Sequence, residues 1–415
     1  MPPRPALLAS LCLSALLSLS VTAPAYPASP DPRRVHEAAV VLDTHFDTPA
    51  NLGRPGWSIL DRHDTARDGS QVDLPRMIEG GVDGGFFAVF TPQGARGAAG
   101  NAAARDHALY RASEIREMVA RHSDRFALAL TADDPARILA ARKRFVFMSM
   151  ENGSPVAGDL SLMQAFYRLG VRMIGPVHFR NSDLADSATD TPEWGGLSPA
   201  GRSFVAEANR LGMVIDASHA SDASLDQMIA LSEAPLILSH SGCKDVFDHP
   251  RNVDDARLRA LAAKGGVIQI NAFSAYMVPT PRIPEREAAL KDLAKSLGVS
   301  GQDMTDGQRK GFTEGRKSID ARWPVPRANI DDFMKHMLHA LAVIGPDHVG
   351  VSGDFDGGGG IDGLNDVSDY PEITRRLLAA GYSPADINKI WSGNALRVLK
   401  TAEAVRDRLQ TPKAD

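Results

Sequence analysis

The sequence predicts an α/β fold, specifically a (β/α)8 barrel in which buried parallel strands alternate with helices. The main observation is a series of short apolar runs without the polar alternation of a half-exposed strand. Helical patterns separate most of them, and an open doubly wound sheet is the alternative that this alternation allows. The count of eight runs favours the barrel. These runs are 39–42, 86–90, 145–148, 171–174, 213–216, 235–238, 266–270 and 348–351.

Helix-start signals support this alternation. Ser198 followed by Pro199 is typical of a helix start, and Gly212 is a natural stop. Ser383 with Asp386 three residues later has the spacing of a capping box. Further helices are predicted over 105–121, 160–169, 223–231, 254–263 and 330–342.

One long segment interrupts the pattern between predicted strands seven and eight. Residues 273–327 are rich in Pro, Arg, Lys and Asp, and they show a single helical stretch near 285–297. A connection of this length is usually functional or a surface excursion. We expect an elaborated insertion, about 274–327, on one barrel domain.

The amino terminus has the pattern of a secretory signal peptide. Arg4 precedes an apolar run over 6–21, which is followed by Ala23-Pro24-Ala25. The run is too short for a comfortable membrane span, and residues 401–415 are polar. We therefore expect a signal peptide over 1–25, one domain over 26–415, no membrane anchor, and a periplasmic or secreted protein.

Composition narrows the function classes. The 415 residues carry a formal charge of −5, with 23% charged and 43% apolar residues, which is an ordinary globular balance. Without a basic block, the chain is not expected to bind nucleic acid. Its two cysteines cannot form a thiolate cluster, so His and carboxylates must hold any metal.

His and acidic residues follow or end six of the eight predicted strands. In a parallel barrel these ends meet on one face, where barrel enzymes place their active sites. Imidazole and carboxylate ligands suit zinc and similar divalent ions. Each residue alone could be structural, but their coincidence predicts a metal site. The residues are His45, Asp47, Glu151, His178, His219, His240, Asp354 and Asp356.

Other hydrolase motifs are missing from the sequence, including His-Glu-x-x-His, Gly-x-Ser-x-Gly and the Walker lysine loop. In contrast, motifs between about residues 34 and 399 resemble, in order, those of the membrane (renal) dipeptidases, a zinc-dependent family of amidohydrolase-type barrels. They are Asp43-Thr44-His45-Phe46-Asp47, Val72-Asp73-Leu74-Pro75-Arg76, Gly196-Leu197-Ser198-Pro199, Asp216-Ala217-Ser218-His219, Ser239-His240-Ser241, His249-Pro250-Arg251-Asn252 and Gly350-Val351-Ser352-Gly353-Asp354-Phe355-Asp356.

The resemblance implies two zinc ions per chain. His45 and Asp47 match the ligands of one zinc, and Glu151 matches the bridging carboxylate. His219 and His240 match the ligands of the second zinc.

The resemblance also implies which residues contact the substrate and transfer protons. His178 matches the histidine that assists at the scissile carbonyl, and Arg251 matches the arginine that holds the substrate's terminal carboxylate. Tyr276 matches a substrate-side tyrosine. Asp354 matches the acid/base aspartate, although Asp356 two residues later is the alternative.

The expected function is therefore that of a binuclear zinc dipeptidase. It would cleave dipeptides that carry a free carboxylate and tolerate D-residues at the second position, with a metal-bridging hydroxide as nucleophile. The family also implies a homodimer. The alternatives are an amidohydrolase-type deacylase on the same metal site and a non-catalytic exported protein that binds metal or peptide.

Overall fold

The computed structural model describes residues 1, 30–299 and 304–411. Apart from Met1, the predicted signal peptide over 1–25 lies outside the described residues. In the described part of the chain, no helix combines the length and the apolar character that a membrane span requires.

Parallel strands dominate the structure, and they form two connected sheets. One sheet has the order β1-β2-β4-β5-β6, and the other has the order β10-β9-β7-β8. The barrel strands are β1 (Leu42–Phe46), β2 (Gly84–Phe90), β4 (Arg144–Glu151), β5 (Val171–Ile174), β6 (Val214–Ile215), β7 (Ile237–Cys243), β9 (Val267–Asn271) and β10 (Val349–Ser352).

Two isolated parallel bridges close the ring. Asp216, just after β6, pairs with Ile237 of β7, and Phe46 of β1 pairs with Phe355 beyond β10. The strand path therefore returns to its start, as the predicted (β/α)8 barrel requires. Two short strands lie outside the ring: β3 (Phe126–Leu128) pairs with β4, and β8 (Asn252–Val253) pairs with β7.

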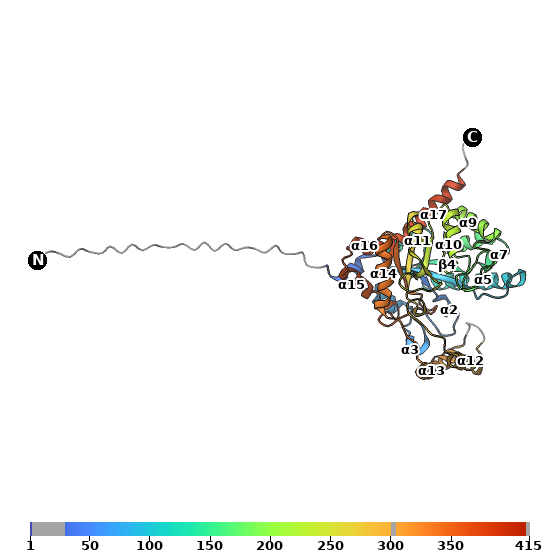
Figure 1. The fold of residues 1–415 in the computed structure, drawn as a ribbon, viewed down its shortest axis with the longest axis horizontal. Coiled ribbons are helices and arrows are strands. Elements are labelled where there is room, and N and C mark those ends of the chain that lie inside the picture. The colour runs from blue at the N-terminus through green and yellow to red at the C-terminus, as the bar shows by residue number, and fades with distance from the viewer. Residues whose placement is uncertain (2–29, 300–303, 412–415) are drawn as a thin grey trace.

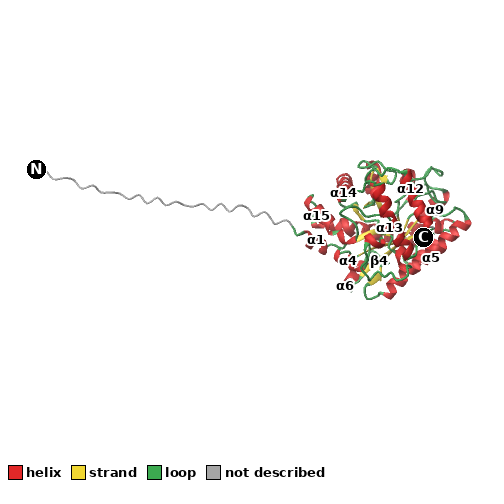
Figure 2. Ribbon diagram, turned by 90° about the horizontal axis from the view of Figure 1, so that it is seen from below, coloured by secondary structure: helices red, strands yellow, loops and turns green. Residues whose placement is uncertain are grey.

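Helices surround the strands (Figures 1 and 2). They are α1 (Pro32–Ala38), α2 (Pro49–Leu52), α3 (Thr65–Asp68), α4 (Leu74–Glu79), α5 (Ala98–Arg121), α6 (Asp134–Ala140), α7 (Ser154–Ala157), α8 (Leu162–Leu169), α9 (Pro199–Leu211), α10 (Asp222–Leu231), α11 (Asp255–Ala263), α12 (Pro284–Ser296), α13 (Asp306–Arg322), α14 (Ile330–Ile344), α15 (Pro371–Ala379), α16 (Pro384–Asn388) and α17 (Asn394–Gln410).

The predicted caps start these helices as expected. The Ser198 side chain accepts a hydrogen bond from the Gly201 amide, and Gly212 ends α9 with a φ of 71°. Ser383 and Asp386 form the predicted capping box of α16. Side-chain caps of this kind contribute about 1 kcal/mol each, because they satisfy amides that have no partner inside the helix.

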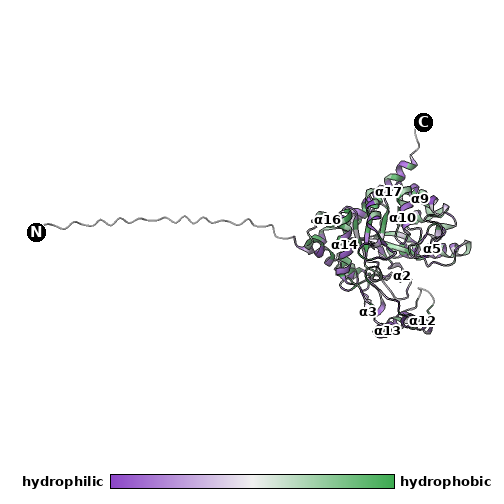
Figure 3. Cartoon of the chain, in the orientation of Figure 1, coloured by the Kyte–Doolittle hydropathy of each residue, from purple (hydrophilic) through white to green (hydrophobic). Residues whose placement is uncertain are grey.

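The barrel interior is filled by apolar side chains at the strands' amino ends. Leu42, Val214 and Val267 begin their strands and cluster with Val398 and Leu399 of α17. The packing of α17 therefore closes this end of the barrel and leaves the opposite end for a site. Figure 3 shows hydrophobic residues along the central strands and hydrophilic ones over α12 and α13.

The first predicted strand, 39–42, is misplaced. Ala39 is the C-cap of α1, and β1 instead begins at Leu42 and runs to Phe46. Strand β1 continues to pair with β2 through its polar residues, since Asp43 lies opposite Gly85. Glu151 and His240 likewise lie inside β4 and β7 and not beyond them.

The segment between β9 and α14 contains more helix than the sequence pattern predicted. The expected helix near 285–297 is α12, but a second helix, α13, follows it. A capping box between Thr305 and Gln308 starts α13. The single predicted helix is therefore an underestimate, because α13 has a mixed polar surface without a clear apolar stripe. Figure 1 places α12 and α13 beside α3.

Candidate metal centre

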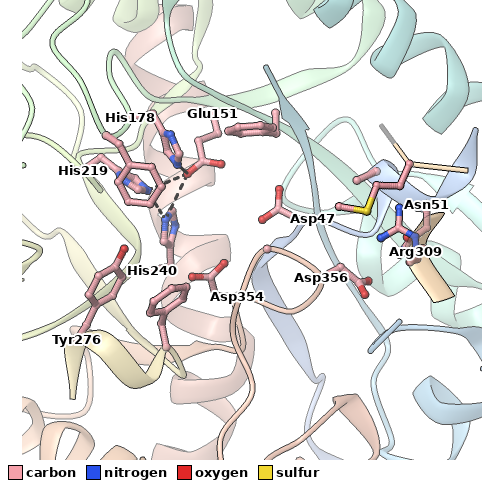
Figure 4. Close-up of a pocket in the computed structure, with 16 residues that line it drawn as sticks. Asp47, Asn51, Glu151, His178, His219, His240, Tyr276, Arg309, Asp354 and Asp356 are labelled. Atoms are coloured by element: carbon pink, nitrogen blue, oxygen red, sulfur yellow. Dashed lines mark hydrogen bonds and ion pairs between the residues drawn. The ribbon is translucent and has the colours of Figure 1, made fainter. Parts of the chain in front are cut away.

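Four histidines surround one buried carboxylate at the carboxyl end of the barrel. The Glu151 Oε1 atom lies 2.9 Å from His219 Nε2, 3.4 Å from His240 Nε2 and 3.6 Å from His178 Nε2. Its Oε2 atom lies 3.5 Å from His45 Nε2. All four imidazoles therefore present Nε2 to the same carboxylate. Figure 4 shows three of them, His178, His219 and His240, around Glu151.

Each of these side chains comes from a different strand or the loop after it. His45, Glu151 and His240 lie in β1, β4 and β7. His178 and His219 follow β5 and β6. His219 has a φ of 67°, which is uncommon for a residue with a Cβ atom. This strained backbone conformation turns the His219 side chain into the cluster, and strain of this kind is typical of functional sites.

The electrostatics of the cluster favour positive charge near Glu151. Burial alone would raise the pKa of Glu151, but His178 and His45 and the close contacts with His219 and His240 lower it well below its usual value. Burial alone would lower the pKa of His45, whereas Glu151 and Asp47 raise it well above its usual value. The buried carboxylates therefore stabilise a cation at this position.

His219 and His240 are neutral imidazoles. Burial, followed by nearby positive groups, lowers the pKa of both well below the usual value. The Ser239 hydroxyl donates to Asp216 Oδ2 at 2.5 Å, so at 2.8 Å it accepts from Nδ1 of His240. The lone pair of His240 Nε2 then faces Glu151, as metal coordination requires.

A second group of ligand atoms adjoins the first. Atoms of His45, Asp47 and Asp354 lie within 4.8 Å of one another, as do those of His45, Glu151 and His240, and those of Glu151, His178 and His219. All five ligands predicted from the sequence are therefore together. His178 and Asp354 join them at the same place.

Asp354 and Asp356 have different surroundings. Burial raises the pKa of Asp354 to about 7, and its Oδ2 accepts a hydrogen bond from Asn271 at 3.1 Å. Asp356 accepts hydrogen bonds from Thr48 Oγ1 at 2.6 Å and from the Gln71 amide at 2.8 Å. Asp356 therefore holds two loops together, while Asp354 belongs to the ligand cluster.

The predicted substrate-side residues flank the cluster. Arg251 is buried, its Nη2 donates to the His240 carbonyl at 3.0 Å, and its guanidinium lies 5.3 Å from the ring centre of Tyr276. Its Nε has no hydrogen-bond partner among the described residues. A buried guanidinium with unused donors is suited to a carboxylate ligand.

A cavity of about 280 Å³ opens onto the ligand cluster. Figure 4 shows Tyr276 and Arg309 on opposite sides of it, with Asp47 and Asp354 between them. The sequence analysis missed several wall residues because they carry no ligand pattern and come from other loops. They are Asn51, Phe90, Phe179, Phe273, Met304 and Arg309.

The donor set fits divalent metal ions. It consists of imidazole nitrogens and carboxylate oxygens without a thiolate, which matches zinc and similar ions. A single Glu151 carboxylate cannot satisfy four surrounding imidazoles, and His219 Nε2 and His240 Nε2 lie only 2.8 Å apart. Cations bound among these atoms would remove that conflict.

A parallel barrel with such a ligand cluster at its carboxyl end defines the class of metal-dependent hydrolase barrels. Comparison with known proteins specifies the family. The model of the membrane dipeptidase family, peptidase family M19, matches residues 31–413. The chain belongs to this family of metallo-dipeptidases.

Individual relatives agree with this assignment. Dipeptidase tcpJ of Claviceps purpurea is 31% identical over 357 residues, which covers 84% of this chain and 73% of that protein. The probable dipeptidase PvdM from Pseudomonas aeruginosa has a similar structure, with a TM-score of 0.76 and 30% identity over 90% of this chain and 98% of that chain.

A third similar structure holds a ligand. It is a metallo peptidase from Rhodobacter sphaeroides with a phosphinate mimic of the dipeptide L-Ala-D-Ala. Its TM-score is 0.68 at 26% identity, and the match covers 88% of this chain and 99% of that chain.

Proposed function

We propose that this protein is a binuclear zinc dipeptidase that cleaves dipeptides with a free C-terminal carboxylate and accepts a D-residue at the second position. One observation carries the proposal: Glu151 lies among four Nε2 atoms, with the buried Arg251 against the His240 carbonyl. This arrangement places a carboxylate-binding group beside a metal-ligand cluster.

His45, Asp47, Glu151, His219 and His240 would hold the two ions. When bound, such ions polarise a carbonyl oxygen and lower the pKa of water towards about 7. The remaining residues bind the substrate and move protons.

His178 is placed to stabilise negative charge on the substrate carbonyl oxygen. Burial lowers its pKa, so the imidazole is neutral at pH 7 and can donate an N–H hydrogen bond. It lies in the cavity wall beside Glu151. Donors of this type contribute about 3–4 kcal/mol to catalysis in other enzymes.

Asp354 is the acid/base group in this proposal. Its pKa of about 7 allows it to take a proton from the attacking water and to pass it to the leaving amine near neutral pH. The hydrogen bond from Asn271 Nδ2 orients the Asp354 carboxyl in the cavity wall.

Arg251 would bind the carboxylate of the C-terminal residue, and Tyr276 would form the wall beside it. The requirement for this carboxylate would limit hydrolysis to dipeptides, because a longer peptide places an amide at the same position. A deacylase for N-acyl amino acids would use the same carboxylate contact, so hydrolysis of free dipeptides is the activity that separates the two functions.

The test is hydrolysis of Ala-D-Ala and Ala-L-Ala by the purified mature chain, with metal content measured on the same samples. We expect two zinc ions per chain, activity on both dipeptides, loss of activity on chelation and recovery with zinc. Amidated dipeptides should be poor substrates. Full activity in metal-free protein, or inactivity of protein that holds two ions, would contradict the proposal.

We also propose that the protein is exported, on the basis of the signal-peptide pattern over residues 1–25. Amino-terminal sequencing of protein isolated from the producing cells tests this. A mature chain that begins at Tyr26 supports export, and an intact Met1 in the cytoplasmic fraction contradicts it.

A further inference from the structure

Arg309 lies in the wall of two neighbouring cavities. It lines the cavity of the metal centre, and it also lines a second cavity of about 340 Å³. Arg309 belongs to α13, which packs against α3. The second cavity therefore lies between the loop that carries α3 and the segment between β9 and α14.

Cationic side chains dominate the second cavity. Its wall contains Arg54, Arg62, Arg67, Arg309 and Lys310, of which Arg62 pairs with Glu79 at 2.6 Å. Arg67 and Lys310 are exposed. Within residues 30–299 and 304–411, neither of these two side chains forms an ion pair with a described carboxylate.

The carboxylates of this wall are already engaged. Asp68 lies 3.0 Å from His63 Nδ1 and accepts the Ser70 amide at 2.9 Å. Asp64 caps α3 by accepting the Ala66 amide. The two acidic side chains in the wall therefore serve local structure, and the cavity favours an anionic ligand.

The cavity wall is held in place by contacts between its residues. Trp57 stacks on His63 with ring centres 4.8 Å apart, and Trp57 Nε1 donates to Ser70 Oγ at 3.0 Å. Arg54 donates to Asn51 Oδ1 at 3.0 Å. The Asn51 side chain lines the metal cavity, so this hydrogen bond connects the two cavities directly.

The position of Arg309 in α13 is fixed by the start of the helix. The Thr305–Gln308 capping box fixes the helix start immediately before Arg309 and Lys310. This fixed start sets where the Arg309 side chain leaves α13, so the guanidinium reaches the wall of the metal cavity from a regular element.

The direction of the substrate follows from the proposed function, on which this inference rests. Arg251 and Tyr276 would hold the C-terminal carboxylate on one side, while Arg309 lies on the opposite side beyond Asp47 (Figure 4). With the scissile bond over Glu151, the side chain of the N-terminal residue points towards Asn51 and Arg309.

We propose that Arg309 is a specificity-determining residue that selects dipeptides whose N-terminal residue carries an anionic side chain, such as Glu-Xaa and Asp-Xaa. A guanidinium binds a carboxylate through two parallel hydrogen bonds, which an amide side chain cannot reproduce. A charge-assisted contact of this kind corresponds to about a tenfold to hundredfold preference.

The experiment compares kcat/KM for Glu-Ala, Gln-Ala and Lys-Ala with the zinc-loaded protein and its variants. Glu and Gln side chains have nearly the same shape, so the ratio of kcat/KM for Glu-Ala to that for Gln-Ala measures the effect of the charge alone. We expect wild type to favour Glu-Ala over Gln-Ala by at least about tenfold. The difference should appear mainly in KM, because the contact is equally strong in the ground and transition states.

Arg309→Gln should lower the ratio of kcat/KM for Glu-Ala to that for Gln-Ala from at least about tenfold to about one. Arg309→Glu should reverse the order, so that Lys-Ala exceeds Glu-Ala. The matched control is Arg316→Gln on the same helix, where the side chain is exposed and pairs with Asp320 at 3.2 Å. Arg316→Gln should retain the wild-type preference.

The outcomes separate this inference from the proposed function. Equal hydrolysis of Glu-Ala and Gln-Ala by wild type overturns the inference and leaves the dipeptidase activity intact. An equal loss of both activities in Arg309→Gln also overturns it, because a structural defect does not discriminate between substrates. If zinc-loaded protein cleaves none of the three dipeptides, both proposals are wrong.

Discussion

Asn271 at the end of β9 donates a hydrogen bond to Asp354 just beyond β10, with 3.1 Å between Nδ2 and Oδ2. This bond joins neighbouring strands at the carboxyl end of the barrel. It orients a carboxyl group that burial leaves with a pKa of about 7. The proposed acid/base residue is therefore held in place by the sheet itself.

The first prediction separates Asp354 from Asp356. Asp354→Asn should lower kcat on Ala-D-Ala by about 10²–10⁴, because the amide cannot transfer the proton. Asp356→Asn should retain activity within about tenfold but lower the free energy of unfolding by about 1–3 kcal/mol, since it weakens the contacts to Thr48 and Gln71. Steady-state kinetics and urea unfolding measure the two effects.

Metal content is the control for this comparison. Both variants should hold as much zinc as wild type in elemental analysis, so that a loss of kcat reports on the proton transfer. An Asp356→Asn variant with the larger loss of kcat would assign the acid/base role to Asp356 instead.

The second prediction concerns the link between metal binding and stability. Ligands that bind only the folded state stabilise it, by about 4 kcal/mol at a free concentration 1,000 times Kd. Chelation should therefore lower the unfolding temperature of wild type. Glu151→Gln should reduce the zinc content and show a much smaller shift, because the variant loses the carboxylate that all four imidazoles face.

Calorimetry of each protein with and without chelator gives the comparison. The Arg316→Gln variant changes an exposed residue of α13, and chelation should lower its unfolding temperature as much as that of wild type. A chelator effect of equal size in Glu151→Gln would show that the stabilising ions bind elsewhere.

The third prediction addresses Arg251. Arg251→Lys keeps the charge but loses the planar pair of donors, so KM for Ala-D-Ala should rise about tenfold to hundredfold with a smaller change in kcat. The amidated dipeptide, which lacks the carboxylate, provides the internal control and should respond little. If both substrates lose activity equally, Arg251 serves the fold of the site and not carboxylate recognition.

The fourth prediction is a pH dependence of stability from His336 in α14. Burial lowers the pKa of His336 to about 4, whereas an unfolded histidine has a pKa near 6.5. Between pH 4 and pH 6.5 the unfolded state therefore binds more protons at His336 than the folded state does. Stability from this group is present above pH 6.5 and is lost as pH falls towards 4, by about 2–3 kcal/mol at pH 4.5.

His336→Asn should reduce this loss, because the asparagine Oδ1 can accept from the Cys243 amide as Nδ1 does, at 2.9 Å, without adding a titrating group. Urea unfolding at pH 7.5 and 4.5, with chelator present at both, measures the difference. His122→Asn, at the partly exposed end of α5, is the control and should keep the wild-type difference. An unchanged difference in His336→Asn would contradict the prediction.

Some features of the fold could be predicted because they depend on local chemistry. The caps at Ser198 and Ser383 are hydrogen bonds within one turn, so their residue types are sufficient. The prediction of a strand at 39–42 was wrong for a different reason. The polar residues of β1 are buried by the site, and pairing with β2 extends the strand through them.

The sequence by itself determined the ligand types, their order along the chain and the barrel that brings strand ends together. Only the tertiary structure distinguished the surroundings of Asp354 from those of Asp356, because the two differ in their neighbours and not in residue type. It also placed Arg309 in the cavity wall. That contact depends on how α13 packs against α3, a long-range relationship that no local pattern encodes.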